Sequence, residues 1–275
     1  MREVNTRDAV YIALRLGHAP GGRISVHQTE FLTANGRRLA LRIQEGKDPA
    51  IVWLGGFRSD MVSTKASVIA DWGAKTGRKV VRFDYSGHGE SEGRFEDGTI
   101  SDWLADALAV IGAHGGAAPV LVGSSMGGWI ALLAARRFAA EGRPLGGLVL
   151  VAPAPDFTED LMWARFSEDI RQTILTEGVY RAPSQYSDEP TPITRAFIED
   201  GRANRVLGAP FRVGAPVRVL QGMDDPDVPW EHAMKLVEHL AEDDVIVTLI
   251  KDGDHRLSRP EDLEKLISAV EAMSA

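Results

Sequence analysis

A six-residue run near the middle of the chain has the residue types and spacing of a nucleophilic serine. Residues 123–128 read GSSMGG and follow the apolar run 119–122. Gly-x-Ser-x-Gly places a serine on a tight turn between a strand and a helix, where small neighbours permit close packing. The central serine is Ser125, and the N–H of Met126 would face the developing oxyanion at the start of that helix. The run predicts acyl-transfer chemistry; a glycine-rich turn without chemistry is the alternative.

A serine nucleophile needs a base, and three histidines follow it in the chain. His232 and His239 are seven residues apart within a helical pattern, whereas His255 comes directly after the apolar run 245–250. Sites in α/β sheets form at the carboxyl ends of strands, so His255 is interpreted as the base. The alternative is a solvated loop histidine.

The base in turn needs a carboxylate that holds its tautomer and stabilises the imidazolium. Three aspartates follow the apolar run 216–220, namely Asp224, Asp225 and Asp227. The spacing Gly-x-x-Asp-x-x-Val-Pro favours Asp225, with the other two left as alternatives.

Two further glycine-rich turns follow predicted strands. The first, at 53–57, reads WLGGF, and its Phe57 N–H is the candidate for a second oxyanion donor; a simple strand-ending turn is the alternative. The second, at 84–91, reads DYSGHGES and is interpreted as structural support. Its His88 is interpreted as a hydrogen-bonded loop histidine.

The elements that must position these residues alternate along the chain. Nearly continuous β-branched runs predict strands buried on both faces at 50–54, 79–83, 119–122, 147–152, 216–220 and 245–250. Helical patterns lie at 61–76, 100–113, 127–140, 231–240 and 260–273. A hairpin of 25–32 and 38–44, turning at Asn35-Gly36, precedes them. This order predicts an α/β fold with a mostly parallel sheet covered by helices on both faces.

One long segment, 154–215, interrupts the alternation. It contains no strong strand and has helical patterns at 157–175 and 192–206, which predicts a helical cap inserted into the core. The expected organisation is a core at 23–153 and 216–275, the cap at 154–215 and an N-terminal extension at 1–22. Trp163 and Tyr186 are the candidate substrate contacts, and packing within the cap is the alternative. Further cap aromatics that could line an acyl pocket are Phe166, Tyr180 and Phe197.

Composition narrows the function classes. The 31 basic and 39 acidic residues leave a net charge of −8, which disfavours nucleic acid as a partner. The absence of cysteine excludes a thiol nucleophile, and no His-Glu-x-x-His pattern points to a metal, so no cofactor is expected. No apolar run reaches the ~20 residues that span a bilayer, and residues 1–22 lack the apolar centre of a signal peptide. A cytoplasmic location is the expectation, with the mitochondrial matrix left open.

Taken in order, the motifs WLGGF, DYSGHGES, GSSMGGW, LQGMDDPDVPW and DGDHR resemble the α/β-hydrolase superfamily from about residue 23 onward. That resemblance implies a Ser125, Asp225 and His255 triad. A narrower likeness extends into the insertion through PSQYS at 183–187, and is to serine hydrolases described as acyl-protein thioesterases and acyl-glucuronide esterases. It implies hydrolysis of esters or thioesters. One departure is the oxyanion turn, which reads GGF in place of the commoner HG-x.

The resulting hypothesis is a serine hydrolase acting on a small acyl ester or thioester, with an acylated protein as a further candidate partner. Two alternatives stay open. The first is hydrolysis of peptide, amide or carbon–carbon bonds on the same triad, and the second is a non-catalytic module that binds a small ligand. A haloalkane dehalogenase is disfavoured because it would carry aspartate at the position of Ser125.

Overall fold

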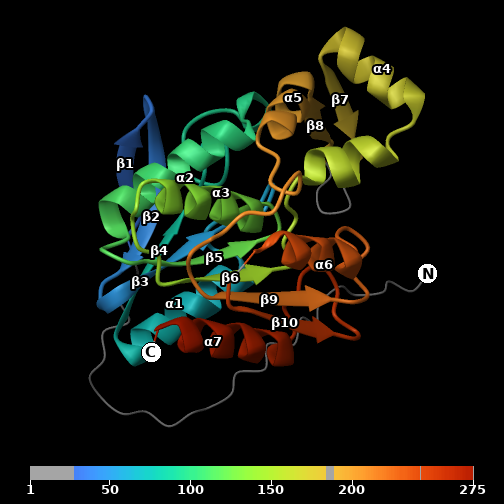
Figure 1. Ribbon diagram of the computed structural model, residues 1–275. Helices are drawn as coiled ribbons and strands as arrows, with labels where there is room; N and C mark the ends of the chain where they lie inside the picture. Colours follow the sequence, from blue (N-terminus) through green and yellow to red (C-terminus); the bar gives the residue numbers. More distant parts are fainter. Residues whose placement is uncertain (1–27, 184–188, 242, 275) are drawn as a thin grey trace, which may run out of the picture.

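The apolar runs form an eight-stranded sheet in the computed structural model, which describes residues 28–183, 189–241 and 243–274 (Figure 1). Its strands are β1 (Glu30–Ala34), β2 (Arg37–Gln44), β3 (Lys47–Leu54), β4 (Arg78–Phe83), β5 (Val120–Ser124), β6 (Gly147–Val151), β9 (Val217–Gly222) and β10 (Val245–Ile250). The order across the sheet is β1-β2-β4-β3-β5-β6-β9-β10. β2 pairs antiparallel with β1 and β4, and all other neighbours are parallel. The predicted mostly parallel α/β sheet is confirmed.

Helices cover both faces of this sheet, which is why its inner strands are apolar at successive positions. The helices of the main fold are α1 (Thr64–Thr76), α2 (Ile100–His114), α3 (Met126–Ala140), α6 (Trp230–His239) and α7 (Pro260–Ser274), with a short 3₁₀ turn η1 (Phe95–Asp97). α1 and α7 lie on one face; α2, α3 and α6 lie on the other (Figure 1). Each face buries its own hydrophobic cluster, and every residue of β5 and β6 is buried. None of the described helices is long and apolar enough to cross a membrane.

The hairpin that precedes the parallel strands turns at Asn35-Gly36. Both residues have positive φ, 51° and 75°, as a two-residue turn of the primed type requires. β1 begins at Glu30, and the first three residues of the predicted strand 25–32 lie outside the described residues, as do Tyr186 and the extension 1–22.

The segment between β6 and β9 contains helices, as predicted, and in addition a pair of short strands that the sequence did not indicate. It contains a π-helical turn η2 (Thr158–Met162), a 3₁₀ turn η3 (Trp163–Arg165), α4 (Glu168–Glu177) and α5 (Arg195–Ala203). Between these two helices, β7 (Val179–Ala182) and β8 (Thr191–Thr194) form a separate antiparallel pair. The left-handed Gly178 ends α4 and turns the chain into β7. Strands of four residues are too short to show a period-two pattern, so the sequence did not reveal them.

Candidate active site

Ser125 lies at the junction of β5 and α3 with an unusual backbone conformation. Its φ is 53° and its ψ is −117°, a sparsely populated region in which strain is held by the surrounding packing. A Cβ at Gly127 would collide with the carbonyl oxygens of Leu54 and Gly55, and one at Gly123 would collide with Gly127. The glycines are therefore needed where β3, β5 and α3 approach one another, as the Gly-x-Ser-x-Gly spacing predicts.

The serine, His255 and Asp225 are joined by two hydrogen bonds. His255 Nε2 is 3.1 Å from Ser125 Oγ, and His255 Nδ1 is 2.8 Å from Asp225 Oδ2. A carboxylate only accepts hydrogen bonds, so Nδ1 carries the proton and Nε2 is free to accept one from the serine hydroxyl. The arrangement matches the geometry of nucleophile, base and orienting acid.

Asp225 is fixed by its own loop. Its Oδ1 accepts hydrogen bonds from the N–H groups of Asp227 and Val228, each at 2.9 Å, and its carboxylate is fully buried. Gln221 Nε2 donates to Oδ2 at 3.3 Å. Sequence reasoning missed Gln221, whose only signal was a polar residue at the end of an apolar strand. Asp224 lies exposed to solvent.

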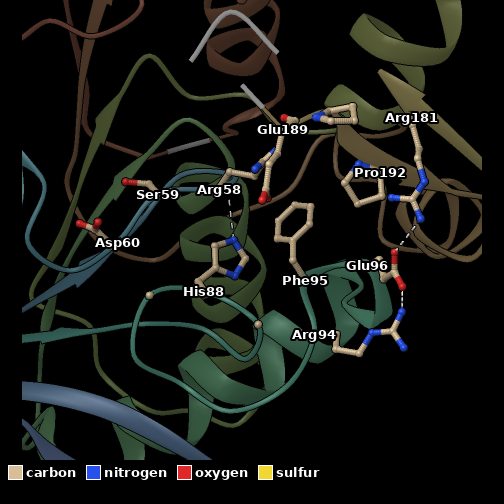
Figure 2. Close-up of a pocket in the computed structure, with 13 residues that line it drawn as sticks. Arg58, Ser59, Asp60, His88, Arg94, Phe95, Glu96, Arg181, Glu189 and Pro192 are labelled. Atoms are coloured by element: carbon tan, nitrogen blue, oxygen red, sulfur yellow. Dashed lines mark hydrogen bonds and ion pairs between the residues drawn. The ribbon is translucent and has the colours of Figure 1, made fainter. Parts of the chain in front are cut away.

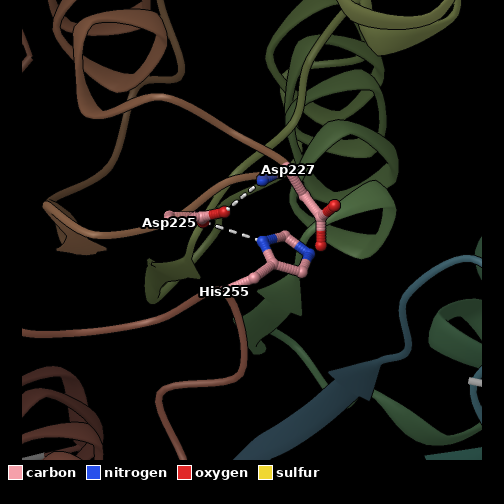
Figure 3. Close-up of side chains that lie close together, drawn as sticks. All are labelled: Asp225, Asp227 and His255. Atoms are coloured by element: carbon pink, nitrogen blue, oxygen red, sulfur yellow. Dashed lines mark hydrogen bonds and ion pairs between the residues drawn. The ribbon is translucent and has the colours of Figure 1, made fainter. Parts of the chain in front are cut away.

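Figure 3 shows Asp227 beside the imidazole that Asp225 holds. Asp225, Asp227 and His255 each offer one ligand atom, and these atoms lie within 4.8 Å of one another. Because Asp225 and His255 already hydrogen-bond each other, the serine–histidine–aspartate arrangement accounts for this cluster, and we assign no metal to it.

Two backbone N–H groups border Ser125. Met126 is the first residue of α3, where helix geometry leaves N–H groups without intrahelical partners. Phe57 belongs to a turn at residues 56–59, closed by a 3.1 Å hydrogen bond from Ser59 N–H to Gly56 C=O. A Cβ at Gly56 would lie 3.6 Å from Ser125 Cβ, so the 56–59 turn passes close to the serine. Within the described ranges, neither Met126 N–H nor Phe57 N–H donates to another group.

A cavity of about 740 Å³ opens beside Ser125 and His255 and is bordered by the insertion. Its apolar lining includes Phe57, Phe157, Leu161, Met162, Phe166 and Ile193. Of the cap aromatics singled out from the sequence, only Phe166 is among the described lining residues. Phe197 is buried and stacks on Phe57 at 5.2 Å, and Tyr180 packs against Phe166.

Trp163 is not among the described lining residues of the cavity. Its ring lies under the guanidinium of Arg202, 4.6 Å from ring centroid to Cζ, and contacts Phe166 at its edge. Trp163 lies in the 3₁₀ turn η3, and the guanidinium of Arg171 also lies over its ring, 5.6 Å from the centroid. A packing role therefore fits this position better than the predicted substrate contact, and the other predicted contact, Tyr186, lies outside the described residues.

One cation on the cavity wall supports the loop that carries the histidine. Lys65, in the first turn of α1, donates from Nζ to the carbonyl oxygen of Arg256. Burial lowers the pKa of the Lys65 ammonium to about 8. The contact ties α1 to the residue that directly follows His255.

A second cavity of about 540 Å³ lies beyond the 56–59 turn (Figure 2). Arg58 and Ser59 line both cavities. Its far side holds Glu96 between Arg94 and Arg181, the latter at 3.4 Å. His88 lies beneath Arg58 as a buried, hydrogen-bonded loop histidine, as its sequence context indicates.

Comparison with known proteins shows the family of the chain. The profile described as the alpha/beta hydrolase family matches residues 50–266. The chain is 34% identical over 237 residues to the human protein named "Palmitoyl-protein thioesterase ABHD10, mitochondrial", covering 85% of this chain and 75% of that one. A putative hydrolase from Agrobacterium vitis S4 is similar in structure, with a TM-score of 0.87, 47% identity and coverage of 90% of this chain and 99% of that one. Alpha/beta hydrolase domain-containing protein 10 from mouse is similar at a TM-score of 0.81, 31% identity and coverage of 90% and 98%. The chain belongs to the alpha/beta hydrolase family, as its ordered motifs indicate.

Proposed function

We propose that the protein is a serine hydrolase that cleaves carboxylic esters or thioesters through an acyl-enzyme. The observation that carries the proposal is the hydrogen-bonded series Ser125–His255–Asp225 at the wall of a cavity. Ser125 Oγ attacks the acyl carbonyl while His255 Nε2 takes the hydroxyl proton, and Asp225 stabilises the imidazolium. His255 then returns the proton to the departing alcohol or thiol. Water, deprotonated by His255, then attacks the acyl carbonyl, and His255 returns that proton to Ser125 Oγ as the carboxylic acid leaves.

The N–H groups of Met126 and Phe57 hold the oxyanion in this mechanism. Both are unpaired within the described residues and flank Ser125, which is what an oxyanion hole requires. No cofactor enters the scheme. The chain's own donors supply the charge stabilisation.

The substrate that fits best has an apolar acyl chain. The apolar side chains lining the cavity suit such a chain, and the human and mouse relatives carry the name of a palmitoyl-protein thioesterase. In this scheme residues 154–215 act as a cap on the core formed by 23–153 and 216–275, and a small acyl ester, an acyl thioester or an acylated protein is the substrate. The cytoplasmic location expected from the sequence stays a prediction. The relatives' names include the word mitochondrial, so the mitochondrial matrix stays the alternative.

A panel of p-nitrophenyl esters, acyl-coenzyme A thioesters and aminoacyl amides, assayed with wild type and Ser125→Ala, tests the proposal. We expect turnover of esters or thioesters that Ser125→Ala abolishes, together with the loss of fluorophosphonate labelling. The neighbouring Ser124→Ala should keep the label. Full labelling of Ser125→Ala would refute the nucleophile, and turnover confined to the amides would replace ester hydrolysis with the amide alternative.

A further inference from the structure

The backbone of the 56–59 turn is strained at Arg58, although the turn itself does not require an arginine side chain at that position. Arg58 has a φ of 58°, the only non-glycine positive φ in this turn. A turn of this kind with a positive φ at its third residue usually carries glycine, because other residues are strained in that conformation. An arginine at this position therefore points to contacts that a glycine would lack.

The backbone of Arg58 makes a first contact, which does not depend on its side chain, on the inner side of the turn. Arg58 N–H is 3.2 Å from Nε2 of His88, and Nδ1 of His88 is 3.2 Å from the Ser86 carbonyl oxygen. An N–H can only donate, so Nε2 is the acceptor and Nδ1 carries the proton that it donates to Ser86. Burial lowers the pKa of His88 to about 4, which keeps this acceptor unprotonated at neutral pH.

The ring that accepts this hydrogen bond is itself held rigidly. His88 is 4% exposed, and its imidazole packs edge-on against Tyr85, Phe95 and Trp103 at centroid distances of 5.7, 5.1 and 5.1 Å. The His88 imidazole, the anchor of the turn, therefore has little freedom to move. Its hydrogen bond fixes the direction of the peptide that joins Phe57 to Arg58.

The second contact lies on the outer side. Arg58 Nη1 donates to Thr191 Oγ1 at 2.7 Å and to the Glu189 carbonyl oxygen at 3.4 Å. Thr191 begins β8, so the side chain of Arg58 connects the turn to the insertion. Figure 2 shows this arrangement, with His88 on one side of Arg58 and Glu189 on the other.

We propose that His88 is a positioning residue for the oxyanion hole, holding the Arg58 N–H so that the adjoining Phe57 N–H faces Ser125. Arg58 then extends the same anchor to β8 of the insertion. The inference rests on the proposed function, because it assigns the 56–59 turn an oxyanion role. It adds His88 as a residue that acts through Arg58 and makes no contact with the reacting atoms.

The test compares His88→Phe, which keeps an aromatic ring without an acceptor, with His88→Gln, whose amide oxygen can replace Nε2. We expect kcat on a p-nitrophenyl ester to fall about 10- to 100-fold in His88→Phe, part of the ~10²–10³ that loss of a whole oxyanion donor costs. KM should change less than kcat, and His88→Gln should recover to within roughly threefold of wild type. Arg94→Ala removes a largely exposed arginine that lines the 540 Å³ cavity together with His88. This variant is the matched control and should leave kcat unchanged.

Two accompanying measurements separate the possible failures. Active-site titration and thermal unfolding report whether His88→Phe is folded, and hydrogen exchange at the Arg58 amide should be slow in wild type and faster in His88→Phe. Wild-type kcat in a folded His88→Phe, or a loss that His88→Gln does not restore, would overturn the positioning role. A wild-type rate in Ser125→Ala would refute the proposed function. Equal hydrogen exchange at the Arg58 amide in wild type and His88→Phe would refute the positioning role of His88, whatever the result with Ser125→Ala.

Discussion

Two regions of the molecule, the carboxyl end of the sheet and the insertion, differ in the interactions that stabilise each of them. Around Ser125, backbones from β3, β5 and α3 pack so closely that a methyl group at Gly127 has no room. In the insertion, elements are short and are joined by side-chain contacts, such as the 2.6 Å pair of Arg202 with Glu159, and the Arg58 bond to Thr191 joins the insertion to the 56–59 turn. Close backbone packing permits one geometry, which chemistry needs. Side-chain contacts tolerate change, which suits the part of the molecule that would select substrates.

The largest expected effect removes the charge that orients the base. Asp225→Asn keeps the shape of the side chain but offers His255 an amide that favours the wrong tautomer, so kcat should fall by about 10⁴. The exposed neighbour change Asp224→Asn is the control and should stay within a few-fold of wild type. Steady-state kinetics on one ester measure both. An Asp225→Asn variant with wild-type kcat would remove this residue from the mechanism.

A pair of glycine substitutions compares the two regions directly. Gly127→Ala drives a Cβ into backbone carbonyls, whereas Gly208→Ala in the insertion places a Cβ with no atom within 4 Å. We expect Gly127→Ala to lower the free energy of unfolding by at least about 3 kcal/mol, and Gly208→Ala by about 1 kcal/mol or less. Urea unfolding measures both, and equal losses would refute the contrast between rigid and adaptable regions.

The pH dependence of stability reports on His88. Its pKa is lowered in the folded protein to about 4, so between the ordinary value and about 4 the unfolded chain binds the additional proton. This contribution to stability is complete above pH ~6.5 and is lost as pH falls toward 4, by on the order of 3 kcal/mol. The wild-type free energy of unfolding should therefore fall more steeply over this range than that of His88→Phe. Parallel curves for the two proteins would contradict a buried neutral His88.

The smallest effect concerns substrate selection by the insertion. Phe166→Ala removes an aromatic ring from the cavity lining and should raise KM for a long-chain ester about 10-fold, from the loss of ~1–2 kcal/mol of apolar contact. The rate on p-nitrophenyl acetate should change little. Trp163→Ala, whose ring packs on Arg202 outside the described lining, should leave chain-length preference unchanged. A shift with Trp163→Ala and none with Phe166→Ala would reverse the assignment of these two residues.

Sequence reasoning succeeded where periodicity and motif order are strong. The predicted strands 147–152 and 245–250 correspond to β6 and β10 within one residue. β6 is buried throughout, as a continuous apolar run predicts, whereas β10 is an edge strand with only its last residue buried, so the predicted burial of 245–250 on both faces is wrong. The close approach of His255 and Asp225 to Ser125 follows from topology, since all three come at the carboxyl ends of parallel strands.

Features that depend on contacts distant in sequence escaped prediction. The β7–β8 pair is too short for a periodic pattern, and the packing of Trp163 on Arg202 joins η3 to α5 across the insertion. The Arg58–Thr191 bond spans 133 positions, and nothing local to either residue indicates it. In the core, the Gly-x-Ser-x-Gly motif predicts one turn geometry. In the insertion, the sequence pattern alone does not determine how the elements pack on one another.

The most direct test of the central claim is to locate the covalent intermediate. Acid quenching during turnover of a p-nitrophenyl ester, followed by proteolysis and mass spectrometry, should find the acyl group on the Ser125 hydroxyl. Loss of the acyl group should be slow in Asp225→Asn, which would make the adduct easier to trap. Continued ester hydrolysis with an acyl group on another residue, or with Ser125 replaced by alanine, would contradict the account.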